Sequence, residues 1–176
     1  MAKPPGKLLK LPSNSAKRRI ENKATWNEAR SAEHADFYTC GYEGRKTEDL
    51  MEALISAGVR SLLDIRYNPV SMYRPELSKT NLQRLVGSAG IEYCHVRDWG
   101  VPREIRAKAV DSGTRETIWE WYDASVVAPF FKKNMHRFLN QNHPVAMMCT
   151  ECDPTECHRH RLFLALEKQG LRGYDL

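Results

Sequence analysis

The stretch Val145-Ala-Met-Met-Cys-Thr-Glu-Cys-Asp-Pro-Thr-Glu-Cys-His-Arg159 contains the pattern of a strand, a turn and the start of a helix. Its first four residues form a short apolar run, which is typical of a buried strand in a parallel sheet. Asp153 then offers an acceptor for free backbone amides, and proline and glutamate follow at the first and third helical positions. We therefore predict a helix that begins at Pro154 and runs through Lys168.

The residues before this unit alternate between strand and helix patterns. The β-prone run Phe37-Tyr-Thr-Cys40 precedes a helical pattern opened by Thr47. Ser61-Leu-Leu-Asp-Ile65 predicts a central strand, and Ile91-Glu-Tyr-Cys-His-Val96 predicts another. Such alternation indicates a parallel sheet covered on both faces. We predict one three-layer α/β domain over residues 36–176, with a mainly parallel sheet flanked by helices.

Residues 1–35 differ in composition from the rest of the chain. They contain eight basic and three acidic residues, which accounts for the whole formal charge of +5. Up to Lys23 they have too few regularly spaced apolar residues to bury a face, so we predict a flexible, basic N-terminal arm that is disordered or loosely attached. A short helix is expected to follow, with a capping box formed by Thr25 and Glu28. The arm either contacts an anionic small molecule or nucleic acid, DNA included, or acts as a solubilising tail.

The composition, with 41% hydrophobic and 28% charged residues, is that of a soluble globular protein. No apolar run approaches the roughly 20 residues needed to cross a bilayer, and no signal-peptide pattern opens the chain. We expect a cytoplasmic protein with no membrane partner. The five cysteines, three of them clustered, do not resemble a disulfide framework. Nothing in the sequence predicts an oligomeric state.

Polar residues gather at the predicted carboxyl ends of the strands, where open parallel sheets bind their ligands. These residues are Tyr42, Glu43, Asp64, Arg66, His95 and Glu151. Asp64 and Arg66 lie two positions apart and share a face of their strand. They form either an ion pair that fixes the next loop or a site in which arginine grips a phosphate or carboxylate and aspartate orients it or acts as a base. We keep both interpretations open.

The cysteine-rich turn supplies a second set of candidates. Free amides at a helix start bind anions and lower the pKa of a cysteine held there. Cys149, at the predicted strand end, is therefore either a thiolate or a buried core residue. His158 falls on the helix stripe that contains Leu162, so it should face the sheet, as a general acid/base or as a hydrogen-bond anchor.

A zinc site is the alternative interpretation of the same turn. Its ligands would be Cys149, Cys152, Cys157 and His160, or His158 in place of His160. Structural zinc sites usually take two short knuckles separated by a longer segment, whereas these residues all belong to one strand-turn-helix. We therefore predict no metal or other cofactor and keep zinc as the alternative.

Four motifs occur in order along the chain and together resemble a known family. They are Gly41-Tyr-Glu-Gly44; Leu62-Leu-Asp-Ile-Arg66 with Asn68, Pro69 and Ser71; Gly90-Ile-Glu-Tyr93 with His95; and Cys149-Thr-Glu151 with Asp153, Pro154 and Cys157-His-Arg159. The pattern is similar to the widespread bacterial and archaeal domain of unknown function 488. The resemblance implies a compact α/β fold with a site shared by the Asp-x-Arg strand end and the Cys-His-Arg helix start. It implies no reaction, and it does not cover the arm.

Our first functional hypothesis is an enzyme that acts on a phosphate-bearing substrate, either a nucleotide or a nucleic acid. The catalytic candidates are His158 as acid/base, Asp64 or Glu151 as a second proton-transfer or orienting group, and Cys149. The substrate-binding candidates are Arg66 and Arg159, which would hold the anion, together with Tyr42, Asn68, Ser71 and His95.

Two alternatives come from other functional classes. One is a thiol-based transferase resembling the rhodanese group, in which Cys149 takes up sulfur, although the short cradle loop ending in Gly-x-Arg is missing. The other is a non-catalytic module that binds an anion or a nucleic acid through the same pocket.

Overall fold

The computed structural model describes residues 14–176 of the chain. A five-stranded parallel sheet forms its centre, in the order β3-β2-β4-β1-β5. The strands are β1 (Phe37–Gly41), β2 (Ser61–Asp64), β3 (Glu92–His95), β4 (Val145–Cys149) and β5 (Gly173–Asp175). The predicted α/β domain with a parallel sheet is thus confirmed.

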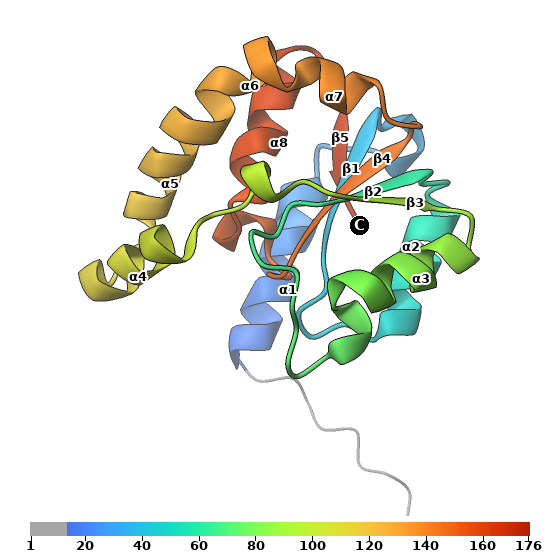
Figure 1. Cartoon of the computed structure of the whole chain (residues 1–176), viewed down its shortest axis with the longest axis horizontal. Coiled ribbons are helices and arrows are strands. Elements are labelled where there is room, and N and C mark those ends of the chain that lie inside the picture. The colour runs from blue at the N-terminus through green and yellow to red at the C-terminus, as the bar shows by residue number, and fades with distance from the viewer. Residues whose placement is uncertain (1–13) are drawn as a thin grey trace, which may run out of the picture.

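Helices cover both faces of the sheet (Figure 1). On one face lie α2 (Thr47–Ser56) and α3 (Lys79–Ser88); on the other lie α5 (Glu116–Tyr122), α6 (Ala128–Lys133), α7 (Met135–Leu139) and α8 (Arg159–Lys168). A π-helical segment, Asp123–Val127, joins α5 to α6, and α4 (Arg103–Ser112) extends away from the sheet beside α5. Shorter 3-10 turns are η1 (Ala32–His34), η2 (Pro75–Leu77), η3 (Arg97–Trp99) and η5 (Pro154–Glu156). Among the helices of residues 14–176, none has the length and apolar character of a bilayer-spanning segment.

The strands β1, β2 and β4 are buried on both sides because each face of the sheet packs against helices. Successive side chains of a strand alternate between faces. Leu63 and Met147 accordingly join the core beneath α5–α8, while Leu62 and Met148 join the core beneath α2 and α3. Two buried cores leave the carboxyl edge of the sheet as the place where polar side chains collect.

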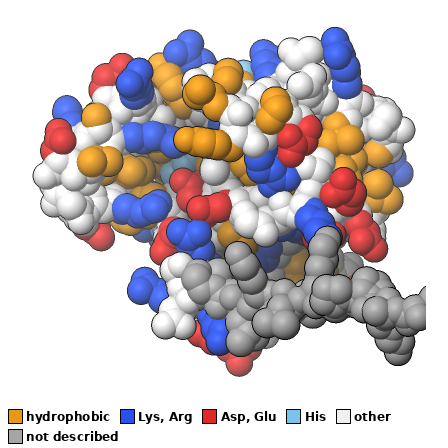
Figure 2. Space-filling model, turned by 90° about the horizontal axis from the view of Figure 1, so that it is seen from below, with side chains coloured by type: hydrophobic (Ala, Val, Ile, Leu, Met, Phe, Trp, Pro, Cys, Tyr) orange, Lys and Arg blue, Asp and Glu red, His pale blue; other side chains and the backbone are white. Residues whose placement is uncertain are grey.

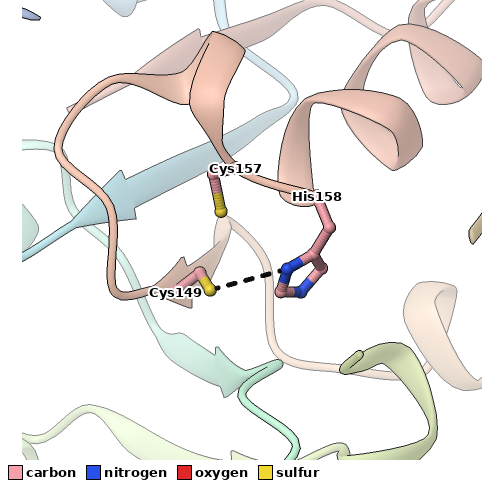
Figure 3. Close-up of side chains that lie close together, drawn as sticks. All are labelled: Cys149, Cys157 and His158. Carbon is pink, nitrogen blue, oxygen red and sulfur yellow. Dashed lines mark hydrogen bonds between the residues drawn. The ribbon is translucent and has the colours of Figure 1, made fainter. Parts of the chain in front are cut away.

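The predicted helix start at Pro154 is wrong, although its cap is present. The Asp153 carboxylate accepts a hydrogen bond from the Thr155 amide at 2.8 Å, as the capping pattern requires. The 3-10 turn η5 then ends at Cys157, which has extended backbone angles (φ −115°, ψ 141°), and α8 begins only at Arg159. This extended residue redirects the chain between the turn and the helix, and it turns the Cys157 side chain toward the end of β4 (Figure 3).

The arm differs from its prediction over the residues that the structure describes. Residues Asn14–Asn27 form a helix, α1, and the predicted cap at Thr25 lies inside it. Tertiary contacts hold α1 against the domain: Trp26 packs on Phe163 with ring centroids 5.2 Å apart, and the Lys23 ammonium lies 3.4 Å from the Asp175 carboxylate. Such contacts stabilise a helix whose local sequence pattern is weak. The prediction for residues 1–13 lies outside the described residues.

Candidate functional site

Two adjoining cavities lie at the carboxyl edge of the sheet. The first, which we call the basic cavity, has a volume of about 690 Å³ and is bordered by the segments that follow β2, β3 and η3. Its basic side chains are Arg66, Lys79, Arg97, Arg103 and Arg106. No acidic side chain among the described residues lines it. A cavity of this composition favours anions.

The second cavity, which we call the mixed cavity, has a volume of about 370 Å³. Its wall is largely apolar and includes Ile118 and Trp119, and it also carries the polar side chains Arg115, Glu151, Glu156 and His158. Val101 and Arg106 line both cavities, so the two spaces are neighbours in one groove. Figure 2 shows the underside of the molecule, where Lys and Arg side chains surround a hollowed area that contains acidic and histidine side chains.

The end of β4 places a thiol beside a carboxylate and an imidazole. The Cys149 thiol donates a hydrogen bond to Glu151 Oε2 at 3.3 Å, and its Sγ lies 3.8 Å from His158 Nδ1. Cys157 brings a second thiol to the same place, and Figure 3 shows the three side chains of Cys149, Cys157 and His158 converging. We call these three residues the thiol–imidazole cluster. The cluster is buried, whereas Glu151 and His158 also reach the wall of the mixed cavity.

His158 is oriented by the backbone of the neighbouring strand. Its Nε2 lies 3.3 Å from the Ile65 carbonyl oxygen, which only accepts, so we assign the proton of the neutral ring to Nε2. Nδ1 then keeps its lone pair toward Cys149. The ring faces the sheet, as its place on the helix stripe predicts. Both ring nitrogens are engaged inside the protein, which leaves Glu151 as the proton-transfer group nearer to the cavity.

Burial and neighbouring charge act against each other at Glu151. Desolvation by itself would raise the pKa of this carboxyl, but the positive charge of His158 in its protonated form, together with hydrogen bonds from the Glu151 backbone amide and from Cys157, outweighs it and lowers the pKa. Burial raises the pKa of the Cys157 thiol well above its usual range, and contact with Cys149 adds to this effect. Glu151 is therefore an ionised carboxylate at neutral pH, beside a neutral Cys157 thiol.

Asp64 and Arg66 form a buried ion pair at the end of β2. Arg66 donates two hydrogen bonds to the Asp64 carboxylate, at 2.8 and 2.6 Å, and a third to the carbonyl oxygen of Leu77 in the following loop at 2.9 Å. The Tyr93 hydroxyl also donates to Asp64. These bonds fix the loop after β2, which is the structural interpretation of the pair, while Arg66 still borders the basic cavity.

Arg159 lies behind the site and lines neither cavity. Its side chain is fully buried, pairs with Asp175 at 3.1 Å, and donates to the carbonyl oxygens of Glu151 at 2.5 Å and Cys152 at 3.0 Å. Gly41 makes room for this arrangement, because a β-carbon there would stand 1.8 Å from the Glu151 carbonyl oxygen. Arg159 therefore holds the cysteine-rich turn in place, and it has no face on which to bind the predicted anion.

Of the other residues predicted to bind substrate, two line the basic cavity and two lie outside it. Asn68 and His95 line the basic cavity, and His95 Nε2 lies 2.9 Å from the Arg66 carbonyl oxygen. Tyr42 is buried and accepts a hydrogen bond from Arg66 at 3.2 Å, so it supports that side chain from behind. Ser71 lines neither cavity and forms hydrogen bonds within its own loop.

Sequence reasoning missed the exposed cations of the groove. Lys79, Arg97, Arg103, Arg106 and Arg115 were hidden because acidic residues elsewhere balance their charge, so that only the arm looked basic. The sequence did contain a signal, because three of these arginines fall within the eleven residues that follow β3, beyond the carboxyl edge of the sheet.

The structure also changes the set of residues that could hold a metal. Among the described residues, the ligand atoms of Cys149, Cys157 and His158 all lie within 4.8 Å of one another, and they are the one such group. Cys152 stands outside this group. The His160 Nδ1 instead lies 2.5 Å from the carbonyl oxygen of Cys157, and the ring packs on Trp119. The ligand set of the zinc alternative, with Cys152 and His160, is therefore not assembled.

Comparison with known proteins finds no match to the chain among curated proteins or among solved structures. The model of one family, described as Domain of unknown function DUF488, matches residues 46–166. This match covers β2, β3 and β4, both cavities and the thiol–imidazole cluster, and it extends over more than half of the chain. The chain belongs to the DUF488 family, as its four motifs predict.

Proposed function

We propose that this protein is an enzyme that acts on a phosphate-bearing substrate, either a nucleotide or a nucleic acid. The observation that carries the proposal is the groove itself, in which a basic cavity without acidic lining adjoins a mixed cavity with Glu151 in its wall. The first cavity suits an anion, and the second offers an apolar surface and a proton-transfer group. A nucleotide unit combines these two requirements in one molecule.

The basic cavity provides the phosphate end of the site. Lys79, Arg97, Arg103 and Arg106 are exposed, and no carboxylate of the described residues pairs with them. Arginine matches phosphate oxygens with two parallel hydrogen bonds, and a cluster of cations raises the local concentration of an anionic ligand. The volume of about 690 Å³ is in the range of small-molecule sites.

The mixed cavity provides the end that receives the nucleobase or another flat group. Trp119 and Ile118 give it an apolar wall, and Arg115 borders the same space. Stacking of a base on an aromatic side chain contributes about 1–3 kcal/mol and does not depend on the base. Arg106 lies where the two cavities adjoin, so one bound molecule would contact both ends.

The chemistry would take place where Glu151 meets the mixed cavity. Its carboxylate is the group placed to accept or return a proton at the bound substrate. The Cys149 thiol donates to this carboxylate, and His158 contacts Cys149 in turn. These contacts fix the position of Glu151, which is what a proton-transfer group requires.

Ligand binding tests the basic cavity. The purified protein is titrated with nucleotides, short single-stranded and double-stranded oligonucleotides and inorganic phosphate, and the same panel is applied to Arg103→Ala/Arg106→Ala. We expect the double variant to lose at least roughly tenfold in affinity, about 1.4 kcal/mol. Lys108→Ala is the matched control, because Lys108 is exposed on the same helix and lines neither cavity. Absence of binding by the wild-type protein to every phosphate-bearing ligand would refute the proposal.

Turnover tests the role of Glu151. Ligands that bind are incubated with the protein and analysed for products by mass spectrometry. Glu151→Gln should bind the ligand with little change and form product at least roughly 100-fold more slowly. Binding without any product from the wild-type protein would favour the non-catalytic binding module instead.

Sulfur transfer through Cys149 is the second candidate, and one observation favours it. The Nδ1 atom of His158 lies 3.8 Å from the Cys149 sulfur and is placed to take its proton. The Cys149 side chain is fully buried, however, so a sulfur donor has no direct access to it. If the Cys149→Ala variant forms product in the turnover assay at the rate of the wild-type protein, sulfur transfer through Cys149 is excluded.

A further inference from the structure

The thiol–imidazole cluster has the composition of a metal site. We propose that Cys149, Cys157 and His158 bind a zinc-class divalent ion in tetrahedral geometry, with the fourth position toward Glu151. Zinc in proteins prefers thiolate sulfur and imidazole nitrogen, so binding of the ion would displace the protons of the Cys149 and Cys157 thiols to solvent and end the hydrogen bond from Cys149 to Glu151. This site does not depend on the identity of the substrate, and it uses a different ligand set from the one that the sequence spacing suggested.

The distances in the cluster fit a tetrahedral ion. Zinc–sulfur bonds of about 2.3 Å and zinc–nitrogen bonds of about 2.0–2.1 Å place the two ligand atoms roughly 3.6 Å apart at a tetrahedral angle. The separation between Cys149 Sγ and His158 Nδ1 is 3.8 Å, and all three ligand atoms lie within 4.8 Å of one another. An ion therefore requires only small side-chain adjustments.

The imidazole is already held in the orientation that a metal ligand needs. Metal-binding histidines usually donate their second N–H to a carbonyl or carboxylate, which fixes the ring and its tautomer. The contact of His158 Nε2 with the Ile65 carbonyl oxygen has this form, and it directs the Nδ1 lone pair into the cluster. Figure 3 shows the sulfur atoms of Cys149 and Cys157 on the side to which that nitrogen points.

Three protein ligands leave one tetrahedral position for another group. Structural zinc sites are closed by four protein ligands, whereas catalytic zinc sites keep one position for water or substrate. The Glu151 carboxylate stands 3.3 Å from Cys149 Sγ and also lines the mixed cavity. The open position would therefore lie beside the cavity in which we place the chemistry.

Metal titration of the reduced, metal-depleted wild-type protein tests the site directly, without nucleotide. We expect one equivalent of Zn²⁺ to bind and to raise the melting temperature. One equivalent of Co²⁺ should give the absorption of a tetrahedral cobalt–thiolate site in competition with Zn²⁺. Cys149→Ser, Cys157→Ser and His158→Gln should each lose stoichiometric binding. Cys152→Ser is the matched control, because it removes a neighbouring thiol outside the cluster.

The outcomes separate the metal site from misfolding and from the proposed function. A wild-type protein that binds neither ion overturns the site whatever the variants do, and so does loss of binding in Cys152→Ser. Circular dichroism identifies any variant that fails to fold. Glu151→Gln should keep the cobalt–thiolate absorption and lose roughly 10–100-fold in metal affinity. If the protein binds nucleotides but no metal, the metal site is refuted and the proposed phosphate-binding role of the basic cavity is retained.

Discussion

The buried arginines near the strand ends and the exposed basic side chains of the basic cavity carry the same charge, but they differ in burial and in their partners. Arg66 and Arg159 are buried and each pairs with an aspartate, whereas Lys79, Arg103 and Arg106 are exposed and form no salt bridge within residues 14–176. A buried charge costs several kcal/mol unless it is paired, so the inner arginines serve the fold. An exposed set of one sign in a cavity lowers stability slightly by self-repulsion and is compensated when an anion binds.

Arg159 should give the largest effect, and that effect should be on stability alone. Arg159→Met leaves Lys23 as the remaining ion-pair partner of the buried Asp175 and leaves two carbonyl oxygens of the turn without their donor. We expect a loss of about 3–5 kcal/mol in the free energy of unfolding, measured by urea denaturation. Arg84→Ala, an exposed position on α3, should stay within about 0.5 kcal/mol. A stable Arg159→Met protein with impaired ligand binding would reverse our assignment.

Substitution of Arg66 should cause a smaller loss of stability together with a loss of ligand binding, because Arg66 is both paired with a buried aspartate and part of the wall of the basic cavity. Arg66→Met leaves Asp64 without its ion-pair partner, but the Tyr93 hydroxyl still donates to it. We expect a cost of about 2–3 kcal/mol. The double variant Arg66→Met/Asp64→Asn should be less destabilised than the sum of the single variants. Additive single effects in denaturation experiments would show that the two residues do not act as a pair.

Arg106 should affect binding without affecting folding. It lines both cavities and is exposed, so Arg106→Ala should weaken the affinity for a phosphate-bearing ligand roughly tenfold, about 1.4 kcal/mol. Its free energy of unfolding should change by no more than about 0.5 kcal/mol. Calorimetric titration beside a denaturation curve measures both quantities. A change confined to the denaturation curve would place Arg106 among the structural arginines.

Lys79 should give the smallest effect, visible mainly in its salt dependence. It lines the basic cavity only, and an ammonium acts on phosphate as a point charge. If the ligand is a nucleic acid, Lys79→Ala should reduce the slope of log affinity against log salt by about 1. A slope equal to that of the wild-type protein would remove Lys79 from the binding surface.

The sequence predicted the sheet well because its strands are determined by local pattern. Four short β-prone runs separated by helical patterns leave few alternatives to a parallel sheet with covered faces. The prediction also brought Asp64, Arg66, Cys149 and His158 to one edge, where the structure places them. Adjacency at a sheet edge follows from topology, so it can be inferred before any side chain is placed.

Three features could not be predicted because they depend on contacts across the fold. The docking of α1 depends on Trp26 meeting Phe163, which lies 137 positions later in the chain. The burial of Arg159 depends on Asp175, a partner supplied by β5. The extended backbone of Cys157 depends on its fit against the end of β4 and has no signal in the capping pattern, which favoured an uninterrupted helix.

The extended backbone at Cys157 makes the length of the preceding loop as important as the identity of Glu151 and Asp153 within it. Seven residues separate Cys149 from Cys157, and His158 then enters α8 at once. An inserted or deleted residue would move Cys157 along the chain and turn His158 by about 100° around the helix axis, away from Ile65. Exchange of Cys152 keeps the spacing. Homologous chains that share this chemistry should therefore keep Glu151, Asp153 and the number of loop residues, while positions such as Cys152 vary.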